Sequence, residues 1–298
     1  MAYRWSIAGR AELIESGFSP TQIRSWLKSG RLTPVLRGVY SYGRDIESRN
    51  AAFKAALVAA GPGSALTGRS ACEKWGLVKP SGTLPGVIQV ARPYGQASIY
   101  DGQSKAMRNC RVDVVRRQLD PASIRRVDRL EAVSPVHALI EFAADASERE
   151  VRFAFLEACR LGFIKKRAAM ECFRALHGRP GAKKLRPLLT MWVPGLNRIK
   201  SVFEGRVLLD WIDRKYPLPE INVKVYGREV DQHWPKKDFV LELDGGAYHS
   251  DPVQRAIDLE KSRFLMARGK TVRRLTYGEY DADPVGSLDR IALELGFM

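Results

Sequence analysis

This chain of 298 residues has little of what disulfide frameworks and zinc sites need. Its four cysteines, Cys72, Cys110, Cys159 and Cys172, are widely spaced and form no C-x-x-C pair. That usage is typical of reduced thiols rather than of a secreted domain. No apolar run reaches the roughly 18–20 residues of a membrane helix, and the first residues lack the apolar core of a signal peptide. We therefore expect a cytoplasmic protein with no membrane partner.

Acidic residues are scarce in the first two-thirds of the chain. The net charge is +16, and residues 1–195 hold 32 Lys and Arg against 16 Asp and Glu. Residues 196–298 hold 17 of each sign, so they contribute nothing to the excess. A basic region of this kind favours a polyanionic partner, most simply double-stranded DNA. The alternative is a surface whose charge serves only solubility.

The first 45 residues contain two short helical patterns followed by two short strand patterns. We expect helices at Arg10–Gly17 and Thr21–Lys28, the second preceded by a serine cap and a proline at its first position. Strands are expected at Leu32–Leu36 and Gly38–Tyr42. Two helices and a basic hairpin are typical of a winged helix-turn-helix, a DNA-binding motif.

The polar face of the second helix is predicted to enter the major groove of DNA. Its members are Thr21, Gln22, Arg24, Ser25 and Lys28. Arg37, at the bend of the hairpin, is placed to meet phosphate or the minor groove. The basic residues expected to extend the phosphate contacts are Lys165, Lys166, Arg167, Lys183, Lys184 and Arg186. A solvated helix face is the alternative.

The rest of the chain predicts two further domains, separated by a linker at Pro194-Gly195. Residues 49–194 show an Ala-rich helix, a second helix within Ser64–Leu77 that begins after the Ser64/Thr67 region, and several later helices. Strands are expected at Gly86–Ala91 and Arg111–Val115, so this part indicates a mixed α+β domain. Residues 195–298 predict helix, three strands, helix, strand and helix, the order of an α/β sheet with helices on both faces. The chain is therefore expected to be a multi-domain α/β protein, with the winged helix at 1–48.

Three acids and a histidine mark the C-terminal region. Asp231 ends one strand pattern, and the next brings Glu242 and Asp244, which share a face because strand side chains alternate. His249 follows five residues later. Carboxylates converging from two strands make an oxygen-rich pocket that suits Mg²⁺. Magnesium beside a histidine base can hydrolyse a phosphodiester.

These residues carry a resemblance to a known family. The series Ser201-x-x-Glu204, Val230-Asp231, Glu242-Leu243-Asp244-Gly245, Tyr248-His249, Asp258 and Arg274-Leu275 resembles the PD-(D/E)XK nuclease superfamily, in the branch around very-short-patch-repair mismatch endonucleases. The resemblance covers residues 198–298. It implies a restriction-endonuclease-like fold, Mg²⁺ or Mn²⁺ as cofactor and DNA cleavage in a bacterial cytoplasm.

The resemblance also implies roles for single residues. Asp231 and Glu242 correspond to metal-binding acids, the residue at the Leu243 position binds metal through its carbonyl, and His249 corresponds to the group that activates water. Glu204 resembles an outer acid that completes the pocket; an exposed helix glutamate is its alternative.

Asp244 departs from the family, because it stands where lysine usually orients water and stabilises the transition state. Either a second metal replaces that charge or another base acts. Asp258 and Lys261 could line the site, but a simple ion pair one turn apart is favoured.

The N-terminal helices and hairpin resemble the winged-helix domain of AbiEi-type antitoxins, and the segment from Ser134-Pro135 resembles their middle part. Such antitoxins bind their own promoter and counteract a nucleotidyltransferase toxin, which implies that toxin or its operator as a partner. Three functions therefore stay open. One is a metal-dependent DNA endonuclease in bacterial defence or DNA processing. Another is an antitoxin or autorepressor with an inactive nuclease fold, and the third is a purely structural partner-binding protein.

Overall fold

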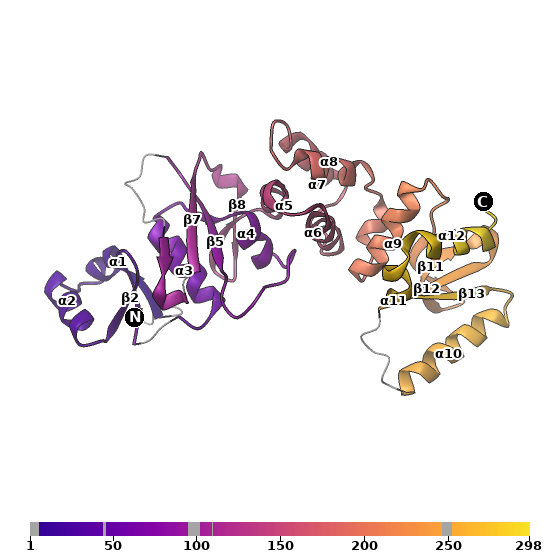
Figure 1. The fold of residues 1–298 in the computed structure, drawn as a ribbon, viewed down its shortest axis with the longest axis horizontal. Helices are drawn as coiled ribbons and strands as arrows, with labels where there is room; N and C mark the ends of the chain where they lie inside the picture. The colour runs from indigo at the N-terminus through magenta and orange to yellow at the C-terminus, as the bar shows by residue number, and fades with distance from the viewer. Residues whose placement is uncertain (1–5, 44–45, 95–101, 109, 246–251) are drawn as a thin grey trace. The chain divides into compact units, whose positions relative to one another are not determined.

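The computed structural model describes residues 6–43, 46–94, 102–108, 110–245 and 252–298. Over these residues the chain is a mixed α/β protein with three β-sheets and twelve α-helices. It divides into two compact units, coloured from indigo to yellow along the chain in Figure 1. Unit 1 comprises residues 1–155 and 171–186, and unit 2 comprises residues 156–170 and 187–298.

Unit 1 begins with two short helices and a three-stranded antiparallel sheet. Its elements are β1 (Ile7–Gly9), α1 (Arg10–Glu15), α2 (Pro20–Lys28), β2 (Leu32–Leu36) and β3 (Val39–Tyr42). The strand order is β1-β3-β2. The expected helices and hairpin strands are confirmed, whereas β1 was not expected because three residues carry no periodic signal.

A capping box begins α2 where the sequence indicates it. The hydroxyl of Ser19 accepts from the backbone N–H of Gln22, while the Gln22 side chain accepts from the backbone N–H of Ser19. Pro20 occupies the first helical position, where its missing N–H costs nothing. Ile23 is fully buried in a small core that also includes Leu13. The opposite face of α2 is thereby left to solvent.

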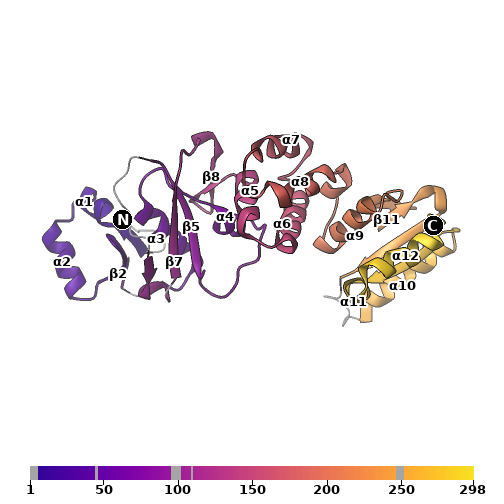
Figure 2. The same ribbon diagram turned by 45° about the horizontal axis from the view of Figure 1, so that its top comes forward.

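The second sheet of unit 1 has six strands in the order β6-β7-β5-β4-β9-β8. Its strands are β4 (Ala65–Leu66), β5 (Val87–Arg92), β6 (Gly102–Ser104), β7 (Cys110–Arg116), β8 (Ile124–Val127) and β9 (Leu130–Val133). Strands β5 and β7 run parallel side by side, with α3 (Arg49–Ala60) nearby (Figure 2). Only β5 and β7 match expected strands, since the other four are two to four residues long.

The helices after α3 are α4 (Gly68–Lys74), α5 (Pro135–Asp145), α6 (Glu148–Arg160), α7 (Lys166–Ala175) and α8 (Ala182–Thr190). The helix expected after the Ser64/Thr67 region is confirmed as α4, whereas the pairing of Ala65 and Leu66 with the neighbouring strands β5 and β9 was not expected. Short 3-10 turns lie at Lys105–Met107, Pro121–Ser123, Pro194–Asn197 and Pro235–Lys237.

Unit 2 contains a four-stranded sheet in the order β10-β11-β12-β13. Its elements are α9 (Val202–Asp213), β10 (Glu220–Val225), β11 (Arg228–Trp234), β12 (Phe239–Asp244), α10 (Pro252–Met266), β13 (Thr271–Thr276), α11 (Tyr277–Ala282) and α12 (Pro284–Glu294). The first three strands are antiparallel, and β13 runs parallel to β12. The expected order is confirmed, with α11 as an additional helix.

Helices cover both faces of this sheet, as the sequence predicts. Trp211 of α9 and Leu288 of α12 pack with Leu241 on one face. Leu265 of α10 packs with Val240 on the other, and Figure 1 shows α10 set apart from α9 and α12. Because side chains alternate along β12, Glu242 points to the α10 face like Val240. The core therefore places Glu242 beneath α10.

No helix among the described residues combines the length and apolar character needed to cross a membrane.

Candidate functional site

Four residues predicted for the site come together in one small cavity of unit 2, which we call the acid pocket. Its volume is about 100 Å³, and it is lined by Asp231, Glu242, Leu243, Asp244, Asp258, Lys261, Ser262 and Arg274. The first four lie on β11 and β12, the next three on α10, and the last on β13. The pocket thus lies where three strands and a helix meet.

The two principal acids lie next to each other at the end of the β11–β12 ladder. The last printed pair of this antiparallel ladder is Gln232 with Leu241, and Asp231 and Glu242 are the next residues of the two strands beyond it. The backbone N–H of Leu243 donates to Oδ2 of Asp231 over 2.7 Å. This bond fixes the Asp231 carboxylate against the end of β12.

The two carboxylates are held in an environment that disfavours their charge. Burial, together with the charge of Glu242, raises the pKa of Asp231 to about 7. Burial also raises the pKa of Glu242, while the nearby Lys261 ammonium opposes that rise. Raised carboxyl pKa values are common in catalytic and metal-binding sites, and structural ion pairs also perturb pKa values.

Two cations balance the acids of the pocket. Nζ of Lys261 donates to Oε2 of Glu242 over 2.9 Å and lies 2.8 Å from Oε1. The guanidinium of Arg274 lies 3.6 Å from Asp244 and 3.9 Å from Asp258. Asp258 and Lys261 both line the acid pocket. The sequence alone favours a simple ion pair between them over this arrangement.

The donor set fits a hard divalent cation. Both carboxylate oxygens of Glu242 lie beside the Lys261 ammonium, and Asp231, Asp244 and Asp258 bring further carboxylates to the same lining. Oxygen donors are what Mg²⁺ and Mn²⁺ prefer. Among the described residues no group of three or more His, Cys, Asp or Glu side chains is arranged to hold a metal ion. His249 lies outside the described residues.

Glu204 is close enough to raise the pKa of Asp231 but does not line the acid pocket. Its carboxylate accepts from the Lys200 backbone N–H at 2.9 Å, the Ser201 hydroxyl at 2.9 Å and the Asn222 amide at 2.7 Å. Ser201 also caps α9 by accepting from the Glu204 N–H. Glu204 is buried, so the alternative of an exposed helix glutamate is wrong, and its outer-acid role stays a prediction.

The predicted DNA-binding residues of unit 1 are exposed. Thr21, Gln22, Arg24, Ser25 and Lys28 all lie on the solvent side of α2. Arg37 is exposed in the turn between β2 and β3. Because these side chains are exposed, they are free of the protein core and could contact the grooves of DNA. That contact stays a prediction.

The basic residues further along the chain differ from one another. Lys165, Lys166 and Arg167 are exposed around the start of α7, and Lys183 is exposed on α8. Lys184 instead donates to the Ala144 and Ala146 carbonyls, over 3.2 and 2.6 Å. Since the last carbonyls of a helix lack internal partners, this ammonium serves the end of α5.

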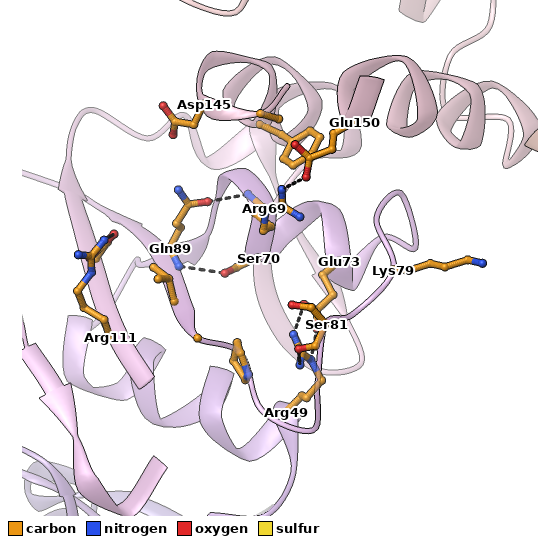
Figure 3. A pocket seen from close by; sticks show the side chains of 16 residues that line it. Arg49, Arg69, Ser70, Glu73, Lys79, Ser81, Gln89, Arg111, Asp145 and Glu150 are labelled. Atoms are coloured by element: carbon orange, nitrogen blue, oxygen red, sulfur yellow. Dashed lines mark hydrogen bonds and ion pairs between the residues drawn. The ribbon is translucent and has the colours of Figure 1, made fainter. Parts of the chain in front are cut away.

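A larger cavity of about 450 Å³ lies in unit 1, and no motif in the sequence marks it (Figure 3). Its lining residues come from positions 49 to 150, so only the fold brings them together. Arg49 binds Glu73 and the carbonyls of Ser81 and Gly82. Further ion pairs of the lining are Arg69 with Glu150 and Arg111 with Asp113. The charged side chains named here therefore form ion pairs with one another within the protein.

Comparison with known proteins gives distant relatives. The chain is 26% identical over 180 residues to "Uncharacterized protein Rv2248" of Mycobacterium tuberculosis strain ATCC 25618 / H37Rv, and equally to "Uncharacterized protein MT2308" of strain CDC 1551 / Oshkosh. Each match covers 58% of this chain and 65% of the relative. The crystal structure of the RV2827C protein from Mycobacterium tuberculosis matches with a TM-score of 0.42 and 18% identity, over 65% of this chain and 75% of that one. No family model matches the chain.

Proposed function

We propose that this protein is a metal-dependent DNA endonuclease that a basic N-terminal region brings to DNA. One observation carries the proposal: Asp231 and Glu242 come from adjacent strands and line one pocket, which also holds an ammonium group. The raised pKa of Asp231 indicates that its charge is held at a cost. A bound dication would remove that cost, because it favours the ionised form of both acids.

The topology of unit 2 supports the resemblance to PD-(D/E)XK nucleases. A helix, three antiparallel strands, a second helix and a strand parallel to β12 follow one another in that order. The acids of the resemblance stand on β11 and β12, which are neighbours in the sheet. Its Asp258 and Arg274 reach the same pocket from α10 and β13.

Within this proposal Asp231, Glu242 and the carbonyl of Leu243 are the groups that would hold a metal ion. When bound, Mg²⁺ or Mn²⁺ supplies Lewis-acid activation of water and of the phosphodiester. The Leu243 N–H keeps the Asp231 carboxylate in place. His249 is the proposed base, because an imidazole is the side chain best suited to accept a proton near neutral pH.

DNA is the proposed substrate because of the fold of unit 1 and the charge of residues 1–195. The polar side chains of α2 and the exposed Arg37 in the β2–β3 turn are arranged as in a winged helix, with α2 for the major groove. The excess of +16 lies entirely in residues 1–195. Phosphate contacts from such a surface give affinity without requiring a particular sequence.

The test is cleavage by the full chain of supercoiled plasmid, mismatched duplex and single-stranded DNA with Mg²⁺ or Mn²⁺. Wild type should cleave at least one substrate, and Asp231→Ala should lose that activity. Glu260→Gln is the matched control, because this α10 carboxylate has a side chain that is 73% exposed and lies outside the acid pocket. Equal behaviour of wild type and Asp231→Ala on every substrate would refute the proposal.

A second candidate is an antitoxin or autorepressor that keeps an inactive nuclease fold. The observation in its favour is that Glu242, Asp244 and Asp258 all have ion-pair partners within the protein. Such a protein would shift its own promoter in a gel assay, and its gene would neighbour that of a nucleotidyltransferase toxin. Specific promoter binding without cleavage of any substrate would decide for this candidate.

A further inference from the structure

We propose that Lys261 is the residue that presents positive charge to the phosphodiester under attack. This assignment rests on the proposed nuclease function and extends it to a residue that the motif pattern does not mark. The observation behind it is that the Lys261 ammonium lies within 2.9 Å of both carboxylate oxygens of Glu242. It therefore stands at the acids that would hold the metal.

The fold holds Lys261 at this position. Lys261 lies one helical turn before Leu265, which is fully buried against Val240 of β12. Residues four apart share a helix face, so anchoring Leu265 turns Lys261 towards the same strand. Its side chain is 24% exposed and that of Glu242 is 13% exposed. The Lys261 side chain thus lines the pocket and is still partly exposed to solvent.

The chemistry needs a cation at this place. Phosphoryl transfer builds negative charge on the nonbridging oxygens, and fixed donors aimed at that charge lower the barrier. Asp244, two residues beyond Glu242 on the same face of β12, offers only negative charge. An ammonium has three donors, so Lys261 can keep one hydrogen bond to Glu242 and give another to a phosphate oxygen.

Arg274, the other cation of the pocket, fits this role less well. Its guanidinium lies between Asp244 and Asp258, at 3.6 and 3.9 Å, and its side chain is 41% exposed. Lys261 instead contacts Glu242, which lines the acid pocket together with Asp231 of the neighbouring strand. A phosphate held by metal on Asp231 and Glu242 would therefore meet Lys261 first.

A purely structural role for Lys261 makes different predictions from a role at the phosphate. If the ammonium only holds Glu242 in place, removing it weakens metal binding. If it acts on the phosphate, removing it leaves metal binding intact or tightens it, because a positive charge leaves the neighbourhood of the cation. The cleavage rate then falls although the metal is still bound.

The experiment combines single-turnover cleavage with Mn²⁺ titration of the full chain, for wild type, Lys261→Met, Lys261→Arg and Lys270→Met. We expect Lys261→Met to lower the cleavage rate by about 100-fold or more, the typical cost of one lost transition-state donor. Its Mn²⁺ dissociation constant should stay equal to or below that of wild type. Lys261→Arg should recover at least about 10-fold of the rate, because the positive charge returns.

Lys270→Met is the matched control. Lys270 also pairs with a carboxylate in unit 2, Asp238 at 2.6 Å, but it does not line the acid pocket. Its replacement should leave the rate within about threefold of wild type. Thermal unfolding of each variant separates loss of function from loss of fold.

Two results would overturn the assignment alone: cleavage by Lys261→Met within threefold of wild type, or a joint loss of Mn²⁺ binding and cleavage. A wild-type protein that neither binds Mn²⁺ nor cleaves any substrate would overturn the nuclease proposal and this assignment with it. The two failures are therefore distinguishable.

Discussion

Replacing Asp231 by asparagine should stabilise the metal-free protein at pH 8. Burial and the charge of Glu242 raise the pKa of Asp231 from its ordinary value of 3.8 to about 7. The folded protein therefore holds this proton more tightly than the unfolded chain does, and ionising the folded carboxyl costs free energy. Asparagine can still accept the hydrogen bond from the Leu243 N–H but brings no charge into the pocket.

The size of the effect follows from the linkage between proton binding and folding. The interval from 3.8 to about 7 is roughly 3 pH units, which at 1.36 kcal/mol per unit corresponds to about 4 kcal/mol. Since the folded pKa is the higher one, wild-type stability falls as the pH rises from about 4 to about 7. Asp231→Asn escapes this fall, so it should exceed wild type by about 2–4 kcal/mol at pH 8 and by under about 1 kcal/mol at pH 4.

Urea unfolding at pH 4, 6 and 8 in the presence of a chelator measures this difference. Tryptophan fluorescence, to which the buried Trp211 and Trp234 of unit 2 contribute, follows unfolding of the full chain. The exposed Glu260 pairs only loosely with Arg228, at 3.4 Å, so Glu260→Gln should change stability by less than about 0.5 kcal/mol at each pH. The reasoning is refuted if Asp231→Asn is no more stable than wild type at pH 8. It is also refuted if the difference in free energy of unfolding between the two proteins is the same at every pH.

Three further predictions concern other parts of the molecule. Leu265→Ala should cost about 2–5 kcal/mol in urea unfolding, because it opens a cavity beneath α10; a loss under 1 kcal/mol would contradict this packing. Arg49→Met should cost about 3–5 kcal/mol by leaving the largely buried Glu73 unpaired, and a second change, Glu73→Met, should recover part of it; no recovery in that double mutant would count against the pair. Arg24→Ala should weaken binding to duplex DNA and lower the slope of log affinity against log salt by about 1; an unchanged slope would place Arg24 away from phosphate.

The sequence is most informative where local chemistry decides structure. Ser19 and Gln22 form the capping box that begins α2, and the spacing of Glu242 and Asp244 on one strand places both in the acid pocket. Alternation along a strand and capping at a helix start both depend on residues a few positions apart. Such patterns can be read without knowing the rest of the fold.

Contacts between distant segments could not be read in this way. The pairing of Lys261 with Glu242 joins α10 to β12 across 19 positions, whereas helix spacing alone suggested Asp258 as its partner. The two-residue strand β4 exists only because β5 and β9 pair with it. The cavity around Arg49 likewise requires residues spread over about a hundred positions. In each case tertiary packing decides the outcome.

Mn²⁺ binding to the full chain at pH 8, followed by electron paramagnetic resonance, tests most directly whether Asp231 and Glu242 share a dication. Wild type and Glu260→Gln should each bind Mn²⁺, and Asp231→Asn should bind it at least about 10-fold more weakly, because a ligand charge is lost. Equal affinity in wild type and Asp231→Asn, or no binding by wild type, would contradict the account.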